Sequence, residues 1–488
     1  MRLFEIVLII INFFTLGWLL FSKKNSKKVS CILFGISFVT TLIQIFAEGY
    51  RIQVLPAYIC LPLNVLIFFL KGRKPRKTWK FVLGSIFSFL YLLIAVALPA
   101  LLPVFSLEKP TGPYQVGTVT YDWTDENRLE EATKDPSDKR ELMVQVWYPA
   151  EKTDNLKRAP YIKDLSAILK GGEKTVPLVS FLLSHLKYVK SNSYTDAKLS
   201  GKQEKYPLLI FSHGYGAFRN ANTFEVEELA SQGYIVVGID HTYDAAATVF
   251  SDGRVAELNQ DTQKMFYSGS VDAMDKHNEI WVKDVEFVLD TVEKINKKDP
   301  LNHFTGKIDL DKIGMFGHSY GGATTAQVLM RDPRVKAGIN MDGYLYGSSI
   351  PDTGVSKPFM MMDADDSMKM FLDKDYLDKS LKRYGITGDL RKRYEKSSIK
   401  YGKIRSNAIA NGGYSMLIKN TDHTSFSDMY LLSPLAKIGR ENPRTVFKII
   451  NDFTLTFFNK YLLGDSSASL EDTAKKYKNI EFTQTKHN

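Results

Sequence analysis

Apolar residues gather at the N-terminus of the chain, in four long runs that precede residue 106. Each run approaches or exceeds the roughly 20 residues that a helix needs to cross the hydrocarbon core of a bilayer. The four runs are Leu3–Phe21, Cys31–Ala47, Val54–Leu70 and Phe81–Phe105. A signal peptide is an alternative for the first run, but it lacks a small-residue cleavage site and three more runs follow. We expect an all-α region of four transmembrane helices over residues 1–107, with the second and third runs forming a helical hairpin.

Beyond residue 108 the pattern changes to short apolar runs separated by amphipathic stretches. Compact β-branched runs of this kind are typical of strands buried on both faces of a parallel sheet. The strand candidates are 115–121, 142–148, 206–211, 234–239, 313–316, 335–341, 358–362 and 414–418. Residues 222–232 and 281–295 have helical spacing, and the charged stretch 122–140 is interpreted as a turn-rich loop. The alternation predicts an α/β domain over residues 108–488, with a mostly parallel sheet and helices on both faces.

Two segments, 161–199 and 363–411, do not fit this alternation. The first contains the apolar stretch Val176–Val189, and the second is rich in Lys, Asp and Tyr and is expected to be helical. Both are predicted to cap an active site. For Val176–Val189 a packing helix of the core is an equally good interpretation, and an interfacial or lid element at a membrane is a further hypothesis.

The net charge of +10 comes from the N-terminal region. Residues 1–80 hold twelve Lys or Arg against two Glu, which leaves 52 basic and 52 acidic residues in the remainder. The excess therefore belongs to membrane loops and gives no support for nucleic-acid binding. The basic clusters 23–28 and 71–80 follow the first and third spans, so the positive-inside bias places both loops in the cytoplasm. We expect a multi-pass protein of the cell membrane whose large domain is extracytoplasmic. Both cysteines lie within predicted spans, so no disulfide framework holds that domain together.

The motif Gly317-His318-Ser319-Tyr320-Gly321-Gly322 directly follows the strand candidate 313–316 and precedes a helix-forming stretch. A strand, G-x-S-x-G and a helix make up the nucleophile-elbow pattern. The flanking glycines are needed because a Cβ would clash in so tight a turn. The turn lifts the serine hydroxyl clear of the sheet, where a histidine can reach it. The pattern predicts that Ser319 is the nucleophile of a serine hydrolase.

A serine nucleophile needs a histidine to take its proton and an acid to fix the tautomer of that histidine. In α/β-hydrolases the chain order is Ser, acid, His, and only His423 and His487 follow the elbow. We predict His423 as the base because it comes just after the last strand candidate, whereas His487 lies one residue from the C-terminus. Asp342 and Asp363 each end a strand candidate, and position alone slightly favours Asp363 as the acid. A third alternative is that both carboxylates merely cap the turns that follow them.

The oxyanion of the reaction needs two backbone N–H donors. One is expected from Tyr320, directly after the nucleophile. The other is expected from Tyr215, in the loop Ser212-His213-Gly214-Tyr215-Gly216 that follows another strand candidate. His213 is interpreted as a structural residue of this loop. His241 ends a strand on the same sheet edge and is predicted to line or brace the site.

Metal and cofactor chemistry has no support in the sequence. It contains no HExxH motif, no paired Cys/His spacing and no P-loop Gly-Lys pair. We therefore expect neither a metal ion nor another cofactor.

Several strings of the large domain resemble the platelet-activating factor acetylhydrolase family of α/β-hydrolases, of the plasma or type II kind. They run in order over roughly residues 112–460: Gly112 to Gly117, Phe211 to Arg219, His241 and Asp244, Gly317 to Thr324, Asp342 and His423. In that family the acid lies shortly after the nucleophile, on the strand that follows the elbow helix. The resemblance therefore implies Asp342 rather than Asp363 as the acid, with Asp363 left to line the site. It also implies calcium-independent cleavage of short or oxidised acyl chains from phospholipids, and of simple esters.

The N-terminal four-helix region departs from the pattern of that family. Together, the two regions predict a membrane-anchored serine ester hydrolase that acts through an acyl-enzyme on lipid or small ester substrates. A serine peptidase or amidase on the same fold is the alternative among enzymes. A catalytically silent, membrane-anchored binding protein is the alternative from another class.

Overall fold

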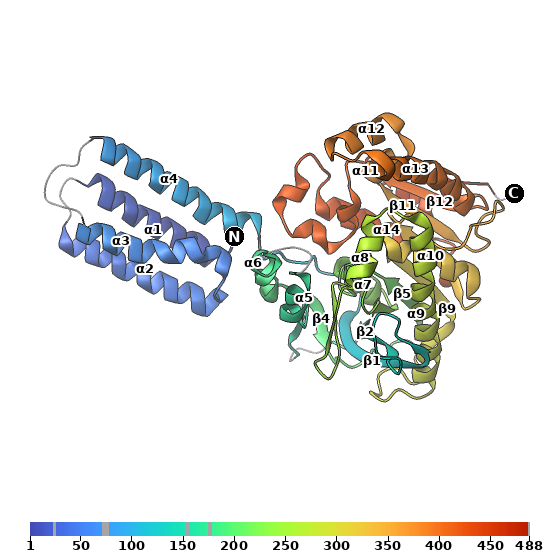
Figure 1. Cartoon of the computed structure of the whole chain (residues 1–488). Coiled ribbons are helices and arrows are strands. Elements are labelled where there is room, and N and C mark those ends of the chain that lie inside the picture. Colours follow the sequence, from blue (N-terminus) through green and yellow to red (C-terminus); the bar gives the residue numbers. More distant parts are fainter. Residues whose placement is uncertain (23–25, 71–77, 153–155, 174–177, 487–488) are drawn as a thin grey trace. The chain divides into compact units, whose positions relative to one another are not determined.

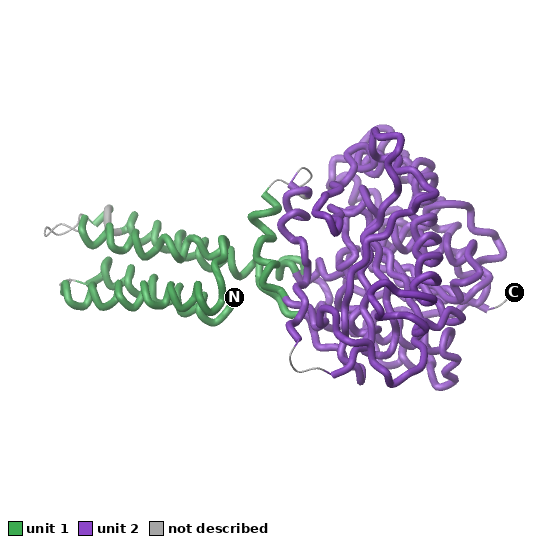
Figure 2. Tube along the Cα trace, turned by 90° about the horizontal axis from the view of Figure 1, so that it is seen from below, with its two compact units in different colours: residues 1–106, 176–189, 432–436 green, residues 107–175, 190–431, 437–488 purple. Residues whose placement is uncertain are grey.

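The computed structural model describes residues 1–22, 26–70, 78–152, 156–173 and 178–486. It divides into two compact units (Figure 2). The first contains residues 1–106, 176–189 and 432–436, and the second contains residues 107–175, 190–431 and 437–488. The basic clusters that set the expected topology, and His487, lie partly or wholly outside the described residues.

Four long helices form most of the first unit, and each matches one apolar run of the sequence. They are α1 (Leu3–Phe21), α2 (Lys27–Glu48), α3 (Leu55–Leu70) and α4 (Thr78–Leu101), with the short 3₁₀ turn η1 (Ile52–Val54) before α3. Four helical stretches are long and apolar enough to span a membrane: Leu3–Phe21, Lys27–Glu48, Ile52–Leu70, which joins η1 to α3, and Val82–Leu101 within α4.

The helices of the first unit bury polar side chains and expose apolar ones. Phe46 is 84% exposed, whereas Glu5 and Asn12 are fully buried. Arg51 forms an ion pair with Glu5 at 3.0 Å, and the Asn12 amide donates to the Ala57 carbonyl at 2.9 Å. Apolar residues such as Leu8 and Ile9 are buried as well, so the interior is mixed and the exposed surface is largely apolar. A largely apolar surface with the polar side chains paired inside is expected of helices surrounded by lipid.

The stretch expected as one helix over 176–189 is shorter in the structure. It forms α6 (Val179–Leu183) and the 3₁₀ turn η2 (Ser184–Tyr188). The Gln53 side chain donates to the Leu182 carbonyl at 3.3 Å, so this stretch packs beside η1 within the first unit. Its role as a cap or lid stays a prediction.

An eleven-stranded sheet is the centre of the second unit. Its strands lie in the order β13 (Ile480–Gln484), β12 (Tyr414–Ile418), β11 (Phe359–Ala364), β10 (Val335–Met341), β9 (Ile308–His318), β5 (Tyr206–Ser212), β6 (Ile235–Asp240), β2 (Lys139–Ala150), β1 (Gln115–Leu129), β4 (Lys190–Thr195) and β3 (Arg158–Pro160). Neighbouring strands from β6 to β12 are parallel. The loops after them therefore meet at one edge of the sheet, where ligands bind in open α/β sheets.

The charged stretch expected as a loop over 122–140 is instead mostly strand. β1 and β2 continue as an antiparallel pair, with Trp123 opposite Leu142 and Asp125 opposite Arg140. The loop prediction holds for residues 130–138 and was wrong for 122–129 and 139–140, which belong to β1 and β2. An antiparallel strand needs only one buried face, so it tolerates charged residues on the other.

Helices cover both faces of the central strands (Figure 1). Ile313 and Met315 of β9 belong to the core cluster that contains Val288 of α9. Gly314, between them, faces the opposite side, where an added Cβ would lie 2.6 Å from Phe458 of α14. On one face α7 (Thr223–Ser231) packs beside α14 (Pro443–Leu462). On the other face α9 (Val271–Lys297) packs beside α10 (Tyr320–Arg331). The mostly parallel sheet with helices on both faces is confirmed.

The remaining elements connect this framework. They are α5 (Leu165–Gly172), β7 (Ala247–Val249), β8 (Val255–Glu257), α8 (Gln260–Tyr267), α11 (Asp365–Leu372), α12 (Lys374–Arg383), α13 (Gly388–Ile409), η3 (His423–Phe426), η4 (Asp428–Leu431), η5 (Pro434–Lys437) and α15 (Leu470–Ala474).

Candidate active site

Ser319 occupies a sharp turn between β9 and α10. Its backbone has φ 57° and ψ −120°, a conformation that an L-residue adopts only under constraint. A Cβ on Gly317 would lie 2.3 Å from the Gly321 carbonyl oxygen, and a Cβ on Gly321 would lie 2.0 Å from the Ser212 carbonyl oxygen. Both glycines are therefore required by close backbone approach, as the elbow pattern predicts.

Asp342 follows β10, and its carboxylate binds His423. The distance from His423 Nδ1 to Asp342 Oδ2 is 2.6 Å. The carboxylate also accepts hydrogen bonds from the Ala364 N–H at 2.8 Å and from the Ser367 hydroxyl at 2.7 Å. The Asp342 side chain is 1% exposed and that of His423 is 48% exposed. An acceptor-only carboxylate on Nδ1 fixes the tautomer of His423 and leaves Nε2 free to take a proton.

The carboxylate also sets the proton affinity of His423. Burial lowers the pKa of this imidazole, but the hydrogen bond and the charge of Asp342 outweigh burial, so the pKa is raised from its ordinary value. Its charged form is thereby stabilised, which is what a general base requires after it has accepted a proton.

Asp363 ends the neighbouring strand β11, but its carboxylate has other partners. Arg405 of α13 binds it through Nε at 3.2 Å and through a second nitrogen, and the Tyr401 hydroxyl lies 3.4 Å away. Asp363 is 1% exposed. The structure brings His423 together with Asp342 and not with Asp363.

The loop after β5 lies directly against the nucleophile. A Cβ on Gly214 would stand 3.0 Å from the Ser319 Cβ and 3.5 Å from its Oγ. Tyr215 is the next residue, and its ring stacks on Phe266 with centroids 3.6 Å apart. Tyr320 is the first residue of α10, so its N–H belongs to the helix turn that has no intrahelical acceptor. The backbone groups expected to hold the oxyanion therefore flank Ser319.

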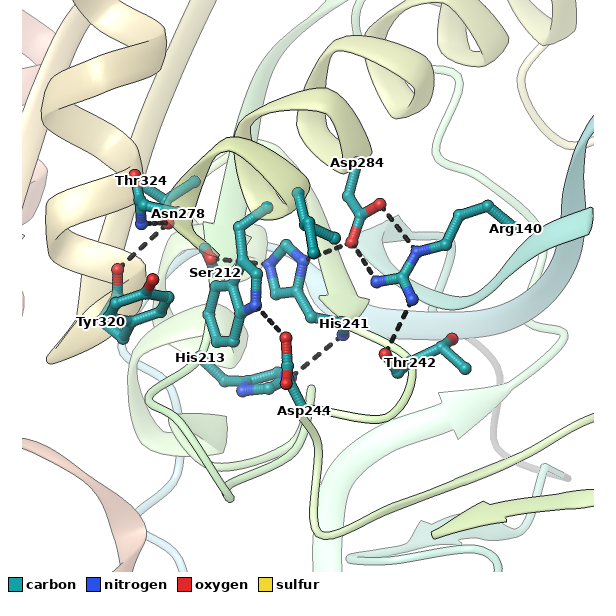
Figure 3. A network of polar contacts seen from close by, with 12 residues as sticks. Arg140, Ser212, His213, His241, Thr242, Asp244, Asn278, Asp284, Tyr320 and Thr324 are labelled. Carbon is teal, nitrogen blue, oxygen red and sulfur yellow. Dashed lines mark hydrogen bonds and ion pairs between the residues drawn. The ribbon is translucent and has the colours of Figure 1, made fainter. Parts of the chain in front are cut away.

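His213, the first residue of this loop, and His241, directly after β6, both point into the interior (Figure 3). Both are fully buried. Burial lowers the pKa of His213 to about 3 and also lowers the pKa of His241, so both rings are neutral. Neither histidine is among the described residues that line the cleft.

Two further residues touch the His423–Asp342 pair and were missed by the sequence analysis. Ser367 donates to the carboxylate, and His318 Nε2 lies 3.0 Å from the His423 carbonyl oxygen. Burial holds the pKa of His318 well below its ordinary value, so its neutral ring donates to that carbonyl. His318 is part of the elbow motif, but within that motif only Ser319 and Tyr320 were predicted to act in the reaction. Ser367 had no signal in the sequence.

A cleft of about 750 Å³ contains Ser319, Asp342 and His423. Most of its other lining side chains are aromatic. The helices α11 to α13 and Tyr384, which directly follows α12, contribute Asp366, Ser367, Met370, Phe371, Tyr376, Ser380, Tyr384, Tyr394 and Ser397. Among the described lining residues there is no Lys or Arg. The segment 363–411 therefore forms one wall of the cleft, whereas no described residue of 161–199 lines it.

Comparison with known proteins identifies the family of this site. The model of the family "Platelet-activating factor acetylhydrolase, isoform II" matches residues 103–479. The chain belongs to this family. The match begins after α4, so the four apolar helices lie outside it.

Individual relatives agree with this membership. Platelet-activating factor acetylhydrolase of Cavia porcellus is 25% identical, over 73% of this chain and 78% of its own. A probable 1-alkyl-2-acetylglycerophosphocholine esterase of Arthroderma benhamiae is 29% identical, over 54% and 65%. A ferulic acid esterase from Streptomyces cinnamoneus has a similar fold, with a TM-score of 0.57 and 24% identity over 78% of this chain and all of that one. The fold is that of an α/β-hydrolase, and this family member is a carboxylic ester hydrolase.

The described residues contain no group of three or more His, Cys, Asp or Glu side chains that is arranged to hold a metal ion.

Proposed function

We propose that the protein is a membrane-anchored serine hydrolase that cleaves short or modified acyl esters of lipid-like substrates. The observation that carries the proposal is the His423–Asp342 hydrogen bond of 2.6 Å in the same cleft as the strained Ser319. A serine on an elbow and a histidine oriented by a carboxylate make up the minimum machinery for acyl transfer.

In the proposed reaction the Ser319 oxygen attacks the ester carbonyl while its proton passes to His423 Nε2. Asp342 keeps Nδ1 protonated and stabilises the imidazolium. The backbone N–H groups of Tyr215 and Tyr320 hold the oxyanion. Return of the proton to the leaving alcohol breaks the C–O bond and leaves an acyl-enzyme. Water, deprotonated by the same histidine, then releases the acid and restores the serine.

The lining of the cleft supports an uncharged acyl group. Aromatic side chains such as Phe371 and Tyr394 favour an apolar acyl group. The lining carboxylates of Asp366 and Asp422 are both paired with Arg440, which is not among the described lining residues. No described lining residue offers a cation to hold an acyl carboxylate. Lipid-like esters with short neutral acyl chains fit this lining best.

The test is hydrolysis of p-nitrophenyl esters from acetate to palmitate by the wild type and by Ser319→Ala. We expect a steep preference for short chains and a loss of activity on the order of 10⁶-fold in the variant. Rates that rise with chain length would indicate a lipase instead. Full activity in Ser319→Ala would refute the proposed nucleophile.

Matched p-nitroanilides separate ester from amide hydrolysis, because the same catalytic groups can serve both. We expect the esters to be cleaved and the anilides not. Faster turnover of an anilide would favour a peptidase or amidase. A wild type that neither turns over substrate nor reacts with a fluorophosphonate would favour a silent binding domain.

The four apolar helices support the anchoring part of the proposal. They bury polar side chains such as Glu5 and Asn12 and expose large apolar ones such as Phe46, and basic residues flank the first and third helices. We propose four membrane spans with the second unit outside the cytoplasm. Protease added to intact cells should then degrade the second unit. Protection of that unit until the membrane is opened would overturn the orientation.

A further inference from the structure

A second Ser-His-Asp set lies in the interior of the second unit, at the start of the loop 212–216 that carries Tyr215 (Figure 3). The Ser212 hydroxyl is 2.8 Å from His241 Nε2, and His241 Nδ1 is 2.9 Å from Asp284 Oδ2. All three residues are fully buried. None is among the described residues that line the cleft. The set therefore has the connectivity of a catalytic triad without access to substrate.

Two arginines hold the carboxylate of this set in its ionised form. Arg140 donates to Asp284 through Nε at 3.0 Å and a terminal nitrogen at 2.6 Å, and Arg128 adds a third contact at 2.6 Å. Burial alone would raise the pKa of Asp284, but these charges and the hydrogen bond of His241 hold it well below its ordinary range. An ionised carboxylate only accepts hydrogen bonds, so His241 carries its proton on Nδ1, and its Nε2 accepts a hydrogen bond from the Ser212 hydroxyl.

His241 also contacts the next residue of the loop. Its backbone N–H donates to His213 Nε2 at 3.2 Å. The other nitrogen of His213 lies 2.7 Å from the Gly214 carbonyl oxygen and donates to it. The ring of His241 is itself fixed, because Trp281 stacks on it with centroids 3.8 Å apart. One residue thus holds both Ser212 and His213.

The positions held in this way are those that abut the nucleophile. Gly214 faces Ser319 so closely that a Cβ would stand 3.0 Å from the serine Cβ. The Ser212 carbonyl oxygen lies only 2.0 Å from the position that a Cβ on Gly321 would take. A shift of Ser212 or His213 would therefore move the loop that carries the Tyr215 N–H.

We propose that His241, oriented by Asp284 and Arg140, is a positioning residue for ester hydrolysis. It holds Ser212 and His213 so that the Tyr215 N–H is aimed at the oxyanion before the reaction begins. The inference rests on the proposed function, in which Ser319 is the nucleophile. Donors that are already in place stabilise the transition state without reorganisation, and a misplacement of about 1 Å costs roughly 10²-fold in rate.

The experiment removes the hydroxyl that His241 holds. Ser212→Ala should lower kcat about 10-fold with KM within about two-fold, because the loss concerns the oxyanion rather than the bound ester. Affinity for a boronic acid inhibitor, which forms a tetrahedral adduct, should fall by the same factor as kcat/KM. Ser212→Cys keeps the shape with a weaker donor and should give an intermediate loss of kcat.

The matched control is Ser193→Ala. Ser193 is also fully buried, and its hydroxyl donates to Glu227 at 2.5 Å, but it is not among the lining residues of the cleft. This variant should lose stability without a change in kcat or in boronate affinity. An equal fall of kcat in Ser193→Ala would reduce the effect at Ser212 to general destabilisation and overturn the inference.

The other outcomes are equally decisive. Unchanged kcat and boronate affinity in a folded Ser212→Ala would overturn the positioning role. If Ser212→Ala does not fold, a wild-type kcat in Ser212→Cys would overturn the positioning role instead. Ser319→Ala keeps the two proposals apart: full activity there refutes the proposed nucleophile, whereas an inactive Ser319→Ala beside a fully active Ser212→Ala refutes only the role of His241.

Discussion

The second unit holds two sets that use the same three side-chain types, Ser, His and Asp. Ser319, Asp342 and His423 all follow strands of the central sheet. In the second set Ser212 and His241 come from the ends of β5 and β6, whereas Asp284 comes from α9. In both, the histidine binds the carboxylate through Nδ1, at 2.6 Å for His423 and at 2.9 Å for His241. Yet His423 is 48% exposed, whereas His241 is fully buried. The hydrogen bond from histidine to carboxylate is therefore shared by the two sets, and the exposure of the histidine distinguishes them.

The two sets also differ in charge. Asp284 faces two arginines, so its negative charge is already balanced and the pKa of His241 is lowered by burial. Asp342 is held by the neutral donors Ala364 and Ser367, so its charge remains available to His423, whose pKa is raised. In the proposed function, Asp342 with its neutral donors orients the general base, whereas the arginine-balanced Asp284 only holds His241 in place.

The largest expected difference between the sets is in reactivity. We expect a fluorophosphonate to label the wild type and Ser212→Ala, and to leave Ser319→Ala unlabelled, because Ser319 lines the cleft beside His423 and Ser212 is not among the described lining residues. Intact-protein mass spectrometry measures the adduct. Labelling of Ser319→Ala, lost only when Ser212 is also replaced, would reverse the assignment of the two sets.

The next difference is in what each carboxylate does. Asp342→Asn should lower kcat about 10⁴-fold with little change in stability, because the amide no longer favours the required tautomer. Asp284→Asn should keep measurable turnover but lower the free energy of unfolding by about 3 kcal/mol, because Arg140 loses its main buried counter-charge. Steady-state kinetics and urea unfolding measure the two effects. Equal losses of kcat would contradict the division of roles.

The pH dependence should separate the two histidines. A general base acts when neutral, so kcat/KM should fall as the pH drops through the raised pKa of His423, with the acid limb above about 6.5. Asp342→Asn removes the charge that raises this pKa, so the limb should move to lower pH. Ser212→Ala should leave the acid limb of the kcat/KM profile at the pH of the wild type. A wild-type limb below the ordinary histidine pKa would show that another group controls the rate.

The smallest effect is expected at His318, whose ring donates to the His423 carbonyl oxygen. His318→Ala removes one neutral hydrogen bond, worth about 1 kcal/mol, so kcat should fall about five-fold if the whole bond is used to position His423. The acid limb should keep its place, because a neutral ring contributes no charge. A kcat equal to that of the wild type would mean that His423 needs no such support.

Much of this site could be predicted because its signals are local. The elbow is recognised from six consecutive residues whose glycines are required by contacts within that turn, as at Gly317. The four apolar helices follow from run length alone. His423 follows from chain order and from its place after the last parallel strand.

The residues next to Asp342 and Asp363 in the sequence could not decide which of the two binds His423. Both residues end adjacent parallel strands, and their neighbours in sequence do not distinguish them. Arg405, 42 residues beyond Asp363, binds that carboxylate in the fold. The family resemblance implied Asp342 where position alone favoured Asp363, and the structure brings His423 to Asp342.

The second Ser-His-Asp set had only a weak signal. Asp284 stands three residues after Trp281 and one before Val285, on the apolar face of its helix, where an acidic residue requires a buried partner. That partner, Arg140, belonged to a stretch interpreted as a loop. No pattern within the chain connects the two positions.

The sequence by itself determined the elbow, the apolar helices, the α/β alternation and the family, because each depends on residues close together in the chain or on their order. The tertiary structure decided which carboxylate meets which histidine, which of the two serines faces the cleft, and which tyrosines line it. These depend on burial and on long-range ion pairs, which arise only when strands and helices distant in the sequence pack together.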